Sequence, residues 1–261
     1  MSIAWASYPY SGTVVLVTGA GSGIGEAIAQ AFLEQGAAVC LVGRSAEALS
    51  RASSAYPAER VCTITADVTD RSQVDAMIAT VLERFGRLDV VVNNAGTFEP
   101  TAIEDYDDEA WERMRRVNVD AVMMVTRAAV GPLRDTRGTV ITVSSIAGMR
   151  GDWNQFGYNA TKGAVNAMMQ SLALDLGGYG IRVNVIAPAF TRTRLTEERL
   201  NDPLFSDALR NRLALDRAAE PNDIARAALW LASPDAGYVT GIVLPVDGGT
   251  TASTGAPRPI R

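Results

Sequence analysis

The chain contains no histidine. Imidazole is the usual base of nucleophilic triads and the commonest metal ligand, so this absence excludes Ser/His/Asp and Cys/His triads and every metal site that needs imidazole. Cysteine is scarce as well. Cys40 and Cys62 lie in separate short apolar runs without CxxC spacing, and we interpret both as buried small side chains. Much of hydrolase chemistry is thereby excluded, and no metal is expected.

Long apolar runs are also missing. No stretch approaches the roughly 18 apolar residues of a membrane span, and MSIAWASYPYSG has no basic segment ahead of an apolar core, so we expect a cytoplasmic protein. With 24 Lys+Arg against 29 Asp+Glu the net charge is −5, which predicts no nucleic-acid partner and no membrane partner. A chain of 261 residues, 48% hydrophobic and 20% charged, fits one globular α/β domain.

Short apolar runs alternate with amphipathic stretches, as in repeated βα units. The predicted strands are 14–18, 38–42, 61–65, 88–92, 138–143, 182–186 and 242–246. The predicted helices are 24–35, 71–85, 108–130, 155–176 and 223–231. Because several strands are continuously apolar, both faces of a mainly parallel sheet should be covered by helices. Two segments depart from this alternation of strands and helices. Residues 190–217 are predicted to be a substrate lid, and 250–261 are predicted to be a mobile tail.

A glycine-rich turn, TGAGSGIG at 18–25, joins the first predicted strand to a helix. Glycines allow a sharp turn close to a pyrophosphate, and a helix N-terminus offers free N–H groups to phosphates. The spacing TGxxxGxG differs from GxGxxG and lacks the lysine of a phosphate-loop NTPase. The second predicted strand ends at Gly43 and Arg44 without an acidic residue, which favours NADP(H) over NAD(H) because Arg44 could meet the 2′-phosphate. Alternatively, Arg44 stacks on adenine or is a solvated charge.

Three further residues form an acid/base pattern without histidine. Ser145 follows the fifth predicted strand, Tyr158 comes thirteen residues later, and Lys162 four residues after that on the same helix face. An ammonium beside the phenol would favour the phenolate and lower a pKa that is about 10 in free tyrosine. The alternative is a half-buried aromatic residue beside a solvated charge.

With TGAGSGIG, NNAG at 93–96, Ser145 with YNATK at 158–162, and Pro188, the chain resembles the short-chain dehydrogenase/reductase family over 13–249, in its shorter branch. The resemblance implies one NAD(P)-binding domain over 1–261, with a Rossmann-type doubly wound sheet of about seven mainly parallel strands and helices on both faces. It also implies an oxidoreductase that interconverts a carbonyl and a secondary alcohol by hydride transfer on a small to medium, partly apolar substrate.

The resemblance also implies site residues. Tyr158 would be the general acid/base, Lys162 would hold the nicotinamide ribose and lower the Tyr158 pKa, Ser145 would orient the substrate oxygen, and Asn118 would help to hold a proton-relay water. The cofactor-binding residues would be Gly19, Ser22, Ile24, Gly25, Arg44, Asp67, Val68, Asn93, Gly96, Tyr158, Lys162 and Thr191. The family usually has Pro-Gly after the sixth strand, whereas this chain has Pro188-Ala189, which puts the Thr191 contact in doubt.

The substrate is less well defined. We expect Phe98, Met149, Trp153, Phe156 and the lid to wall the pocket, while Arg150, Arg192 and Arg194 could meet an anionic substrate. Rival functions on the same fold are a catalytically silent nucleotide sensor and a cofactor-assisted isomerase or dehydratase. A homo-oligomer, either tetramer or dimer, is expected from the resemblance.

Overall fold

The computed structural model describes residues 6–255. Its sheet has seven strands in the order β3-β2-β1-β4-β5-β6-β7, and every neighbouring pair is parallel. The strands are β1 (Val14–Thr18), β2 (Ala38–Gly43), β3 (Val61–Thr65), β4 (Val90–Asn93), β5 (Thr139–Val143), β6 (Arg182–Pro188) and β7 (Val243–Val246). The order reverses between β1 and β4, which makes this the doubly wound Rossmann-type sheet predicted from the sequence.

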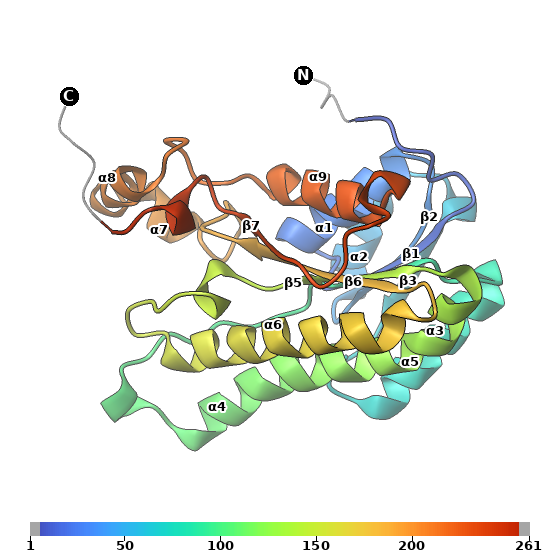
Figure 1. The fold of residues 1–261 in the computed structure, drawn as a ribbon, viewed down its shortest axis with the longest axis horizontal. Coiled ribbons are helices and arrows are strands. Elements are labelled where there is room, and N and C mark those ends of the chain that lie inside the picture. The colour runs from blue at the N-terminus through green and yellow to red at the C-terminus, as the bar shows by residue number, and fades with distance from the viewer. Residues whose placement is uncertain (1–5, 256–261) are drawn as a thin grey trace.

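Helices cover both faces of the sheet (Figure 1). They are α1 (Gly23–Glu34), α2 (Ala46–Ser53), α3 (Arg71–Phe85), α4 (Asp108–Arg115), α5 (Ala121–Thr136), α6 (Phe156–Gly177), α7 (Glu197–Asn201), α8 (Pro203–Arg212) and α9 (Pro221–Ala232). Helices α1 and α9 pack on one face, and α3, α5 and α6 pack on the other. The layers follow from the continuously apolar strands, which have two faces to bury.

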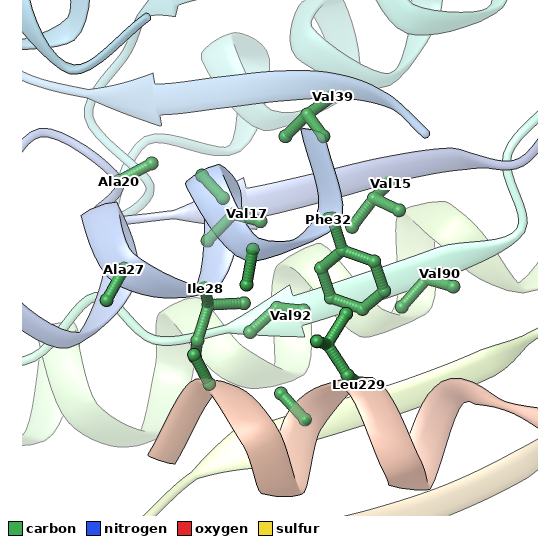
Figure 2. Packing of buried hydrophobic residues seen from close by; sticks show 14 of the residues in the cluster. Val15, Val17, Ala20, Ala27, Ile28, Phe32, Val39, Val90, Val92 and Leu229 are labelled. Atoms are coloured by element: carbon green, nitrogen blue, oxygen red, sulfur yellow. The ribbon is translucent and has the colours of Figure 1, made fainter. Parts of the chain in front are cut away.

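Successive side chains of the central strand β1 belong to the two opposite core clusters in turn. In β1, Val15 and Val17 join the cluster under α1 and α9, whereas Val14 and Leu16 join the opposite cluster. This alternation is the period of two expected for side chains in a strand. Figure 2 shows Phe32, which is fully buried, between the sheet and Leu229 of α9. One apolar strand therefore supplies both halves of the core.

Helix α3 has the predicted bounds because both of its ends carry clear capping residues. The Asp70 carboxylate accepts hydrogen bonds from the N–H groups of Ser72 (2.8 Å) and Gln73 (3.2 Å), and Gly86 ends the helix at φ +72°. The predicted helix 108–130 is instead α4 and α5, joined by a π-helical turn at Arg116–Asp120. Helix α2 was not predicted, because its eight residues include only a few apolar side chains.

The predicted lid is not one long loop. Residues 190–217 include α7 and α8, and α8 begins at Pro203 with Asp202 as its N-cap. In Figure 1 these helices lie together at one end of the molecule. The predicted tail starts with a 3₁₀ turn at Thr250–Ala252, where the Asp247 carboxylate accepts a hydrogen bond from the Thr251 N–H (2.7 Å). Positions 256–261 of that prediction lie outside the described residues.

The two cysteines are neighbours, which their separation in the sequence conceals. Cys40 and Cys62 pair in register on β2 and β3, and their thiols hydrogen-bond each other. Cys40 is buried as predicted, whereas Cys62 on the edge strand is only half-buried. That hydrogen bond, and more weakly the Arg84 guanidinium, lowers the pKa of the Cys62 thiol to about 7. The same hydrogen bond, together with burial, raises the pKa of the Cys40 thiol.

Between residues 6 and 255, no helix has the length and apolar content needed to cross a membrane.

Candidate functional site

The glycine-rich turn lies at the carboxyl end of β1, beside the reversal in strand order. Gly19 has φ +66°, and a Cβ there would lie 2.9 Å from the Asn94 side chain. A Cβ on Gly25 would lie 2.3 Å from the Gly19 carbonyl oxygen. Since real Cβ atoms do not approach so closely, both positions require glycine. The turn and the first residues of α1 are packed backbone against backbone.

This packing leaves the N-terminus of α1 suited to an anion. Ser22 is the N-cap residue in an extended conformation, and its hydroxyl makes no hydrogen bond to the helix. The first N–H groups of the helix and the helix dipole favour a phosphate at this position. Arg51, which the sequence analysis missed, donates to the Gly21 carbonyl (2.9 Å) and holds the turn from the side of α2.

The ends of β2 and β3 form the next part of the site. Gly43 and Thr65 pair in register, so Arg44 and Asp67 follow adjacent strand ends. The pKa of Asp67 is lowered, mainly by hydrogen bonds from the Thr69 N–H and hydroxyl and less by the Arg44 guanidinium. Arg44 is exposed, and among residues 6–255 it makes no hydrogen bond or ion pair. Val68 is buried beside them.

Strand β4 is tied to the glycine turn. The Thr18 hydroxyl accepts hydrogen bonds from the N–H groups of Asn94 (3.0 Å) and Ala95 (3.1 Å). The Asn94 amide donates to the carbonyls of Thr18 (3.0 Å) and Gly19 (3.2 Å). The sequence analysis missed Thr18 and Asn94 as site residues, although both stand within the quoted motifs. The Asn93 side chain is buried and donates to the Thr126 hydroxyl of α5 (3.0 Å).

Asn118 lies buried in the π-helical turn and joins two segments of the site. Its Oδ1 accepts from the Thr97 N–H (2.8 Å), and its Nδ2 donates to the Thr97 carbonyl (2.9 Å) and to the Thr161 hydroxyl (3.2 Å). The side-chain amide is therefore engaged by protein groups. It holds the loop after Gly96 against α6, and a Cβ on Gly96 would lie 3.6 Å from Lys162 Nζ.

Ser145, Tyr158 and Lys162 come together below that loop. The phenol of Tyr158 hydrogen-bonds to the Ser145 side chain, and the Ser145 hydroxyl also accepts from the Ala147 N–H (3.1 Å). Lys162 is 6% exposed and donates from Nζ to the Val143 carbonyl (3.1 Å). Phe98 packs edge-on against the Tyr158 ring, with 5.0 Å between ring centres. Residues from β5, α6 and the loop after β4 thus form one cluster.

The electrostatics of the cluster differ from the prediction. Burial raises the pKa of Tyr158 to about 12, and the only opposing influence is the Ser145 hydrogen bond. Burial also lowers the pKa of Lys162 to about 8. The expectation that Lys162 lowers the Tyr158 pKa is therefore wrong for this structure, because Nζ lies 5.7 Å from the centre of the Tyr158 ring and its hydrogen bond goes to Val143. Lys162 is also the only lysine in the chain.

A cavity of about 190 Å³ opens beside Ser145 and Tyr158. Further residues that line it are Ile24, Phe98, Asp152, Gln155, Pro188, Ala189, Phe190, Thr191, Thr193, Leu195 and Arg199. Thr191 is 5% exposed, and its hydroxyl donates to the Ala189 carbonyl (3.0 Å). The Pro188-Ala189 segment thus leaves Thr191 at the cavity.

Several predicted wall residues lie elsewhere. Trp153 is 90% exposed, and Phe156 packs against Tyr106 with 4.5 Å between ring centres, so neither they nor Met149 line the cavity. Arg150, Arg192 and Arg194 are not in its wall either, and Arg192 pairs with Glu220 (3.4 Å). These predictions were wrong because the short segment before α6 turns Trp153 outward and places Asp152 and Gln155 at the cavity.

Comparison with known proteins agrees with this geometry. The family model described as enoyl-(acyl carrier protein) reductase matches residues 19–251. The chain is 37% identical over 249 residues to the meso-2,3-butanediol dehydrogenase of Serratia marcescens, covering 95% of this chain and 98% of that protein. It is 40% identical over 243 residues to the 3alpha-hydroxysteroid dehydrogenase of Mediterraneibacter gnavus, covering 90% and 95%.

A solved structure shows the same fold. The 3-ketoacyl-(acyl-carrier-protein) reductase of Brucella melitensis, complexed with NADH, superposes with a TM-score of 0.86 at 33% identity, covering 93% of this chain and 99% of that one. Family model, relatives and structure agree on one class of enzyme. The chain therefore belongs to the short-chain dehydrogenase/reductase family and is an NAD(P)-dependent oxidoreductase.

Proposed function

We propose that the enzyme interconverts a ketone and a secondary alcohol on a compact, partly apolar substrate, with Tyr158 as the general acid and base. The observation that carries this proposal is that Ser145 and Tyr158 line one cavity together with Ile24 of the glycine turn, while Lys162 Nζ lies 5.7 Å from the centre of the Tyr158 ring. A nucleotide sensor would not require this cluster.

The residues present fit a dinucleotide. The glycine turn leaves a cradle that a Cβ would fill at Gly19 or Gly25, and the first N–H groups of α1 with the Ser22 hydroxyl suit its pyrophosphate. Ile24, Asn93, Gly96 and Thr191 would surround the ribose and nicotinamide, with Asp67 and Val68 at the adenine. When bound, the nicotinamide supplies or accepts the hydride.

Proton transfer falls to this chain's own side chains. With its pKa raised to about 12, Tyr158 is protonated at neutral pH and can donate a proton to the substrate oxygen during reduction. Ser145 would orient that oxygen and, by its hydrogen bond, favour the phenolate left behind. The Lys162 ammonium has three donors and uses one on Val143, so two remain for ribose hydroxyls.

NADP(H) is the preferred dinucleotide in this proposal. Arg44 is exposed at the end of β2, and the adjacent Gly43 has no side chain to fill the space. Asp67, whose carboxylate lies close enough to Arg44 to be influenced by its charge, already accepts two hydrogen bonds from Thr69. The guanidinium would therefore meet the 2′-phosphate without a competing ion pair.

The compact substrate is supported by the size and lining of the cavity. About 190 Å³ is below the roughly 300 to 1,000 Å³ of pockets for drug-sized ligands. Its lining is mainly apolar, and its one arginine, Arg199, lies over the Phe205 ring with 4.4 Å between the guanidinium and the ring centre. A neutral ketone fits this wall better than an anion.

The remaining features of the proposal concern the whole molecule. We treat 1–261 as a single domain with its lid at 190–217. A homo-oligomer is supported by three large exposed side chains: Leu174 on α6, Tyr179 just after α6, and Tyr238 ahead of β7. A cytoplasmic location is supported by the neighbouring thiols of Cys40 and Cys62, which suit a reducing compartment. Light scattering tests the oligomeric state, and cell fractionation tests the cytoplasmic location.

The central experiment titrates the purified protein with NADPH and NADH separately, follows nucleotide fluorescence, and then adds small ketones and aldehydes. Tighter NADPH binding and ketone-dependent oxidation of NADPH are expected. Arg44→Ala should weaken NADPH by about 10-fold and NADH by less than 2-fold, as expected for loss of one charged contact. Equal losses would favour adenine stacking, and failure to bind either dinucleotide would overturn the proposed function.

A further inference from the structure

A second cavity lies directly behind the first. Its volume is about 200 Å³, and Ala189 and Phe190 line both cavities. Beyond Phe190, the second cavity is bounded by the apolar side chains of Leu213, Leu215 and Val246. The phenyl ring of Phe190 therefore stands in the wall between two spaces of similar size.

The backbone at this wall is fixed. The Ala219 N–H donates to the Phe190 carbonyl (2.9 Å), the Arg192 N–H donates to the Ala219 carbonyl (2.8 Å), and Thr191 forms a parallel bridge with Ala219. Because hydrogen bonds hold the chain at Phe190 itself and at Arg192, we infer that the passage between the cavities depends on the side chain at position 190 and not on movement of the backbone.

The ring is held by the lid helices. Phe190 packs edge-on against Phe205 of α8, with 5.1 Å between ring centres, and the Arg199 guanidinium of α7 lies 5.4 Å from the Phe190 ring centre. Such aromatic and cation–π contacts favour one ring position. The partition is thus a supported side chain, closed while the lid helices are in place.

The polar groups of the second cavity already have partners. Arg217 forms a two-point ion pair with Asp223 (2.6 and 3.0 Å), and the Asp247 carboxylate accepts hydrogen bonds from Gly249 and Thr251. A new charged group would have to break these interactions. An uncharged alkyl chain, in contrast, could pack on Leu213, Leu215 and Val246.

We propose that Phe190 limits the length of the substrate by closing the cavity beside Tyr158 against a second, apolar cavity. This inference rests on the proposed function and narrows it. Short-chain and small-ring ketones and alcohols fit in front of the ring, whereas a long alkyl tail fits only when the ring is removed.

The test measures kcat/KM for methyl ketones of increasing chain length, from 2-butanone to 2-undecanone, with the preferred dinucleotide. The wild type should show a sharp fall beyond a certain length. Phe190→Ala should move this fall to longer ketones and raise kcat/KM for the longest one by at least 10-fold, while Phe190→Leu should lie between. Leu215→Ala is the matched control, since it enlarges the second cavity but leaves the partition in place, and it should keep the wild-type limit.

The outcomes separate this inference from the proposed function. Phe190→Ala or Phe190→Leu enzyme that reduces 2-butanone with an unchanged length limit would overturn the role of Phe190. Wild-type enzyme that reduces 2-undecanone as well as 2-butanone would do the same. If the wild type binds NADPH but does not oxidise it with any of the ketones, the proposed function is overturned, and this inference with it.

Discussion

The lowered pKa of Lys162 can be measured directly, because the chain contains no other lysine. Burial lowers this pKa from 10.5 to about 8. At pH 7 the neutral amine is then about 1 in 11 of the population, against about 1 in 3,000 for an ordinary lysine, an increase of about 300-fold. The reactivity of the amine toward a small acylating reagent should therefore rise with a midpoint near pH 8, well below the midpoint of free lysine.

The assay also depends on Lys162 being the only lysine in the chain. After a short acetic anhydride pulse at each pH, the protein is denatured and digested with a protease that cuts only after lysine. Unmodified chains give fragments of 162 and 99 residues, and acetylated chains stay whole. The N-terminal amine does not interfere because it creates no cleavage site. Nα-acetyl-lysine amide in the same tube corrects for the pH dependence of the reagent.

Two results would refute the reasoning. A midpoint at or above pH 10 would show that burial does not destabilise the ammonium. Labelling at an unchanged rate in saturating NADPH would contradict the placement of Lys162 at the nicotinamide ribose. Lys162→Arg, which can be neither labelled nor cut at this position, is the control for digestion.

Three further predictions follow from the site and the core. Tyr158→Phe should reduce kcat by about 10²- to 10⁴-fold with dinucleotide affinity within 2-fold, since only the proton donor is lost; ketone reduction near the wild-type rate would exclude Tyr158 as the acid. Gly25→Ala should abolish dinucleotide binding because its Cβ would lie 2.3 Å from the Gly19 carbonyl oxygen. Gly131→Ala in α5 is the contrasting variant, since a Cβ there would have no atom within 4 Å. It should raise the free energy of unfolding, measured in urea, by up to about 1 kcal/mol. The Cys62 thiol, with its pKa lowered to about 7, should be alkylated by iodoacetamide before Cys40, which peptide mass mapping would show; equal rates would contradict the different environments of the two thiols.

The sequence alone determined the sheet and most of its helices. Strands such as β1 and β4 are continuous apolar runs, and a run that is apolar on both faces has few alternatives to the interior of a parallel sheet. Helix α3 had predictable ends because Asp70 and Gly86 cap it through local hydrogen bonding and a left-handed conformation. The glycine turn and the Tyr158–Lys162 pair were also visible, since their spacing along the chain already places them on a turn and on one helix face.

Only the tertiary structure decided how those residues are placed against one another. The pKa values of Tyr158 and Lys162 move by burial, which depends on β5 and the loop after β4 closing over α6. The contact of Cys40 with Cys62, the outward position of Trp153 and the partition at Phe190 all arise from register and packing between distant segments. Local spacing carries no information about such contacts, because they depend on which surfaces meet once the whole sheet has formed.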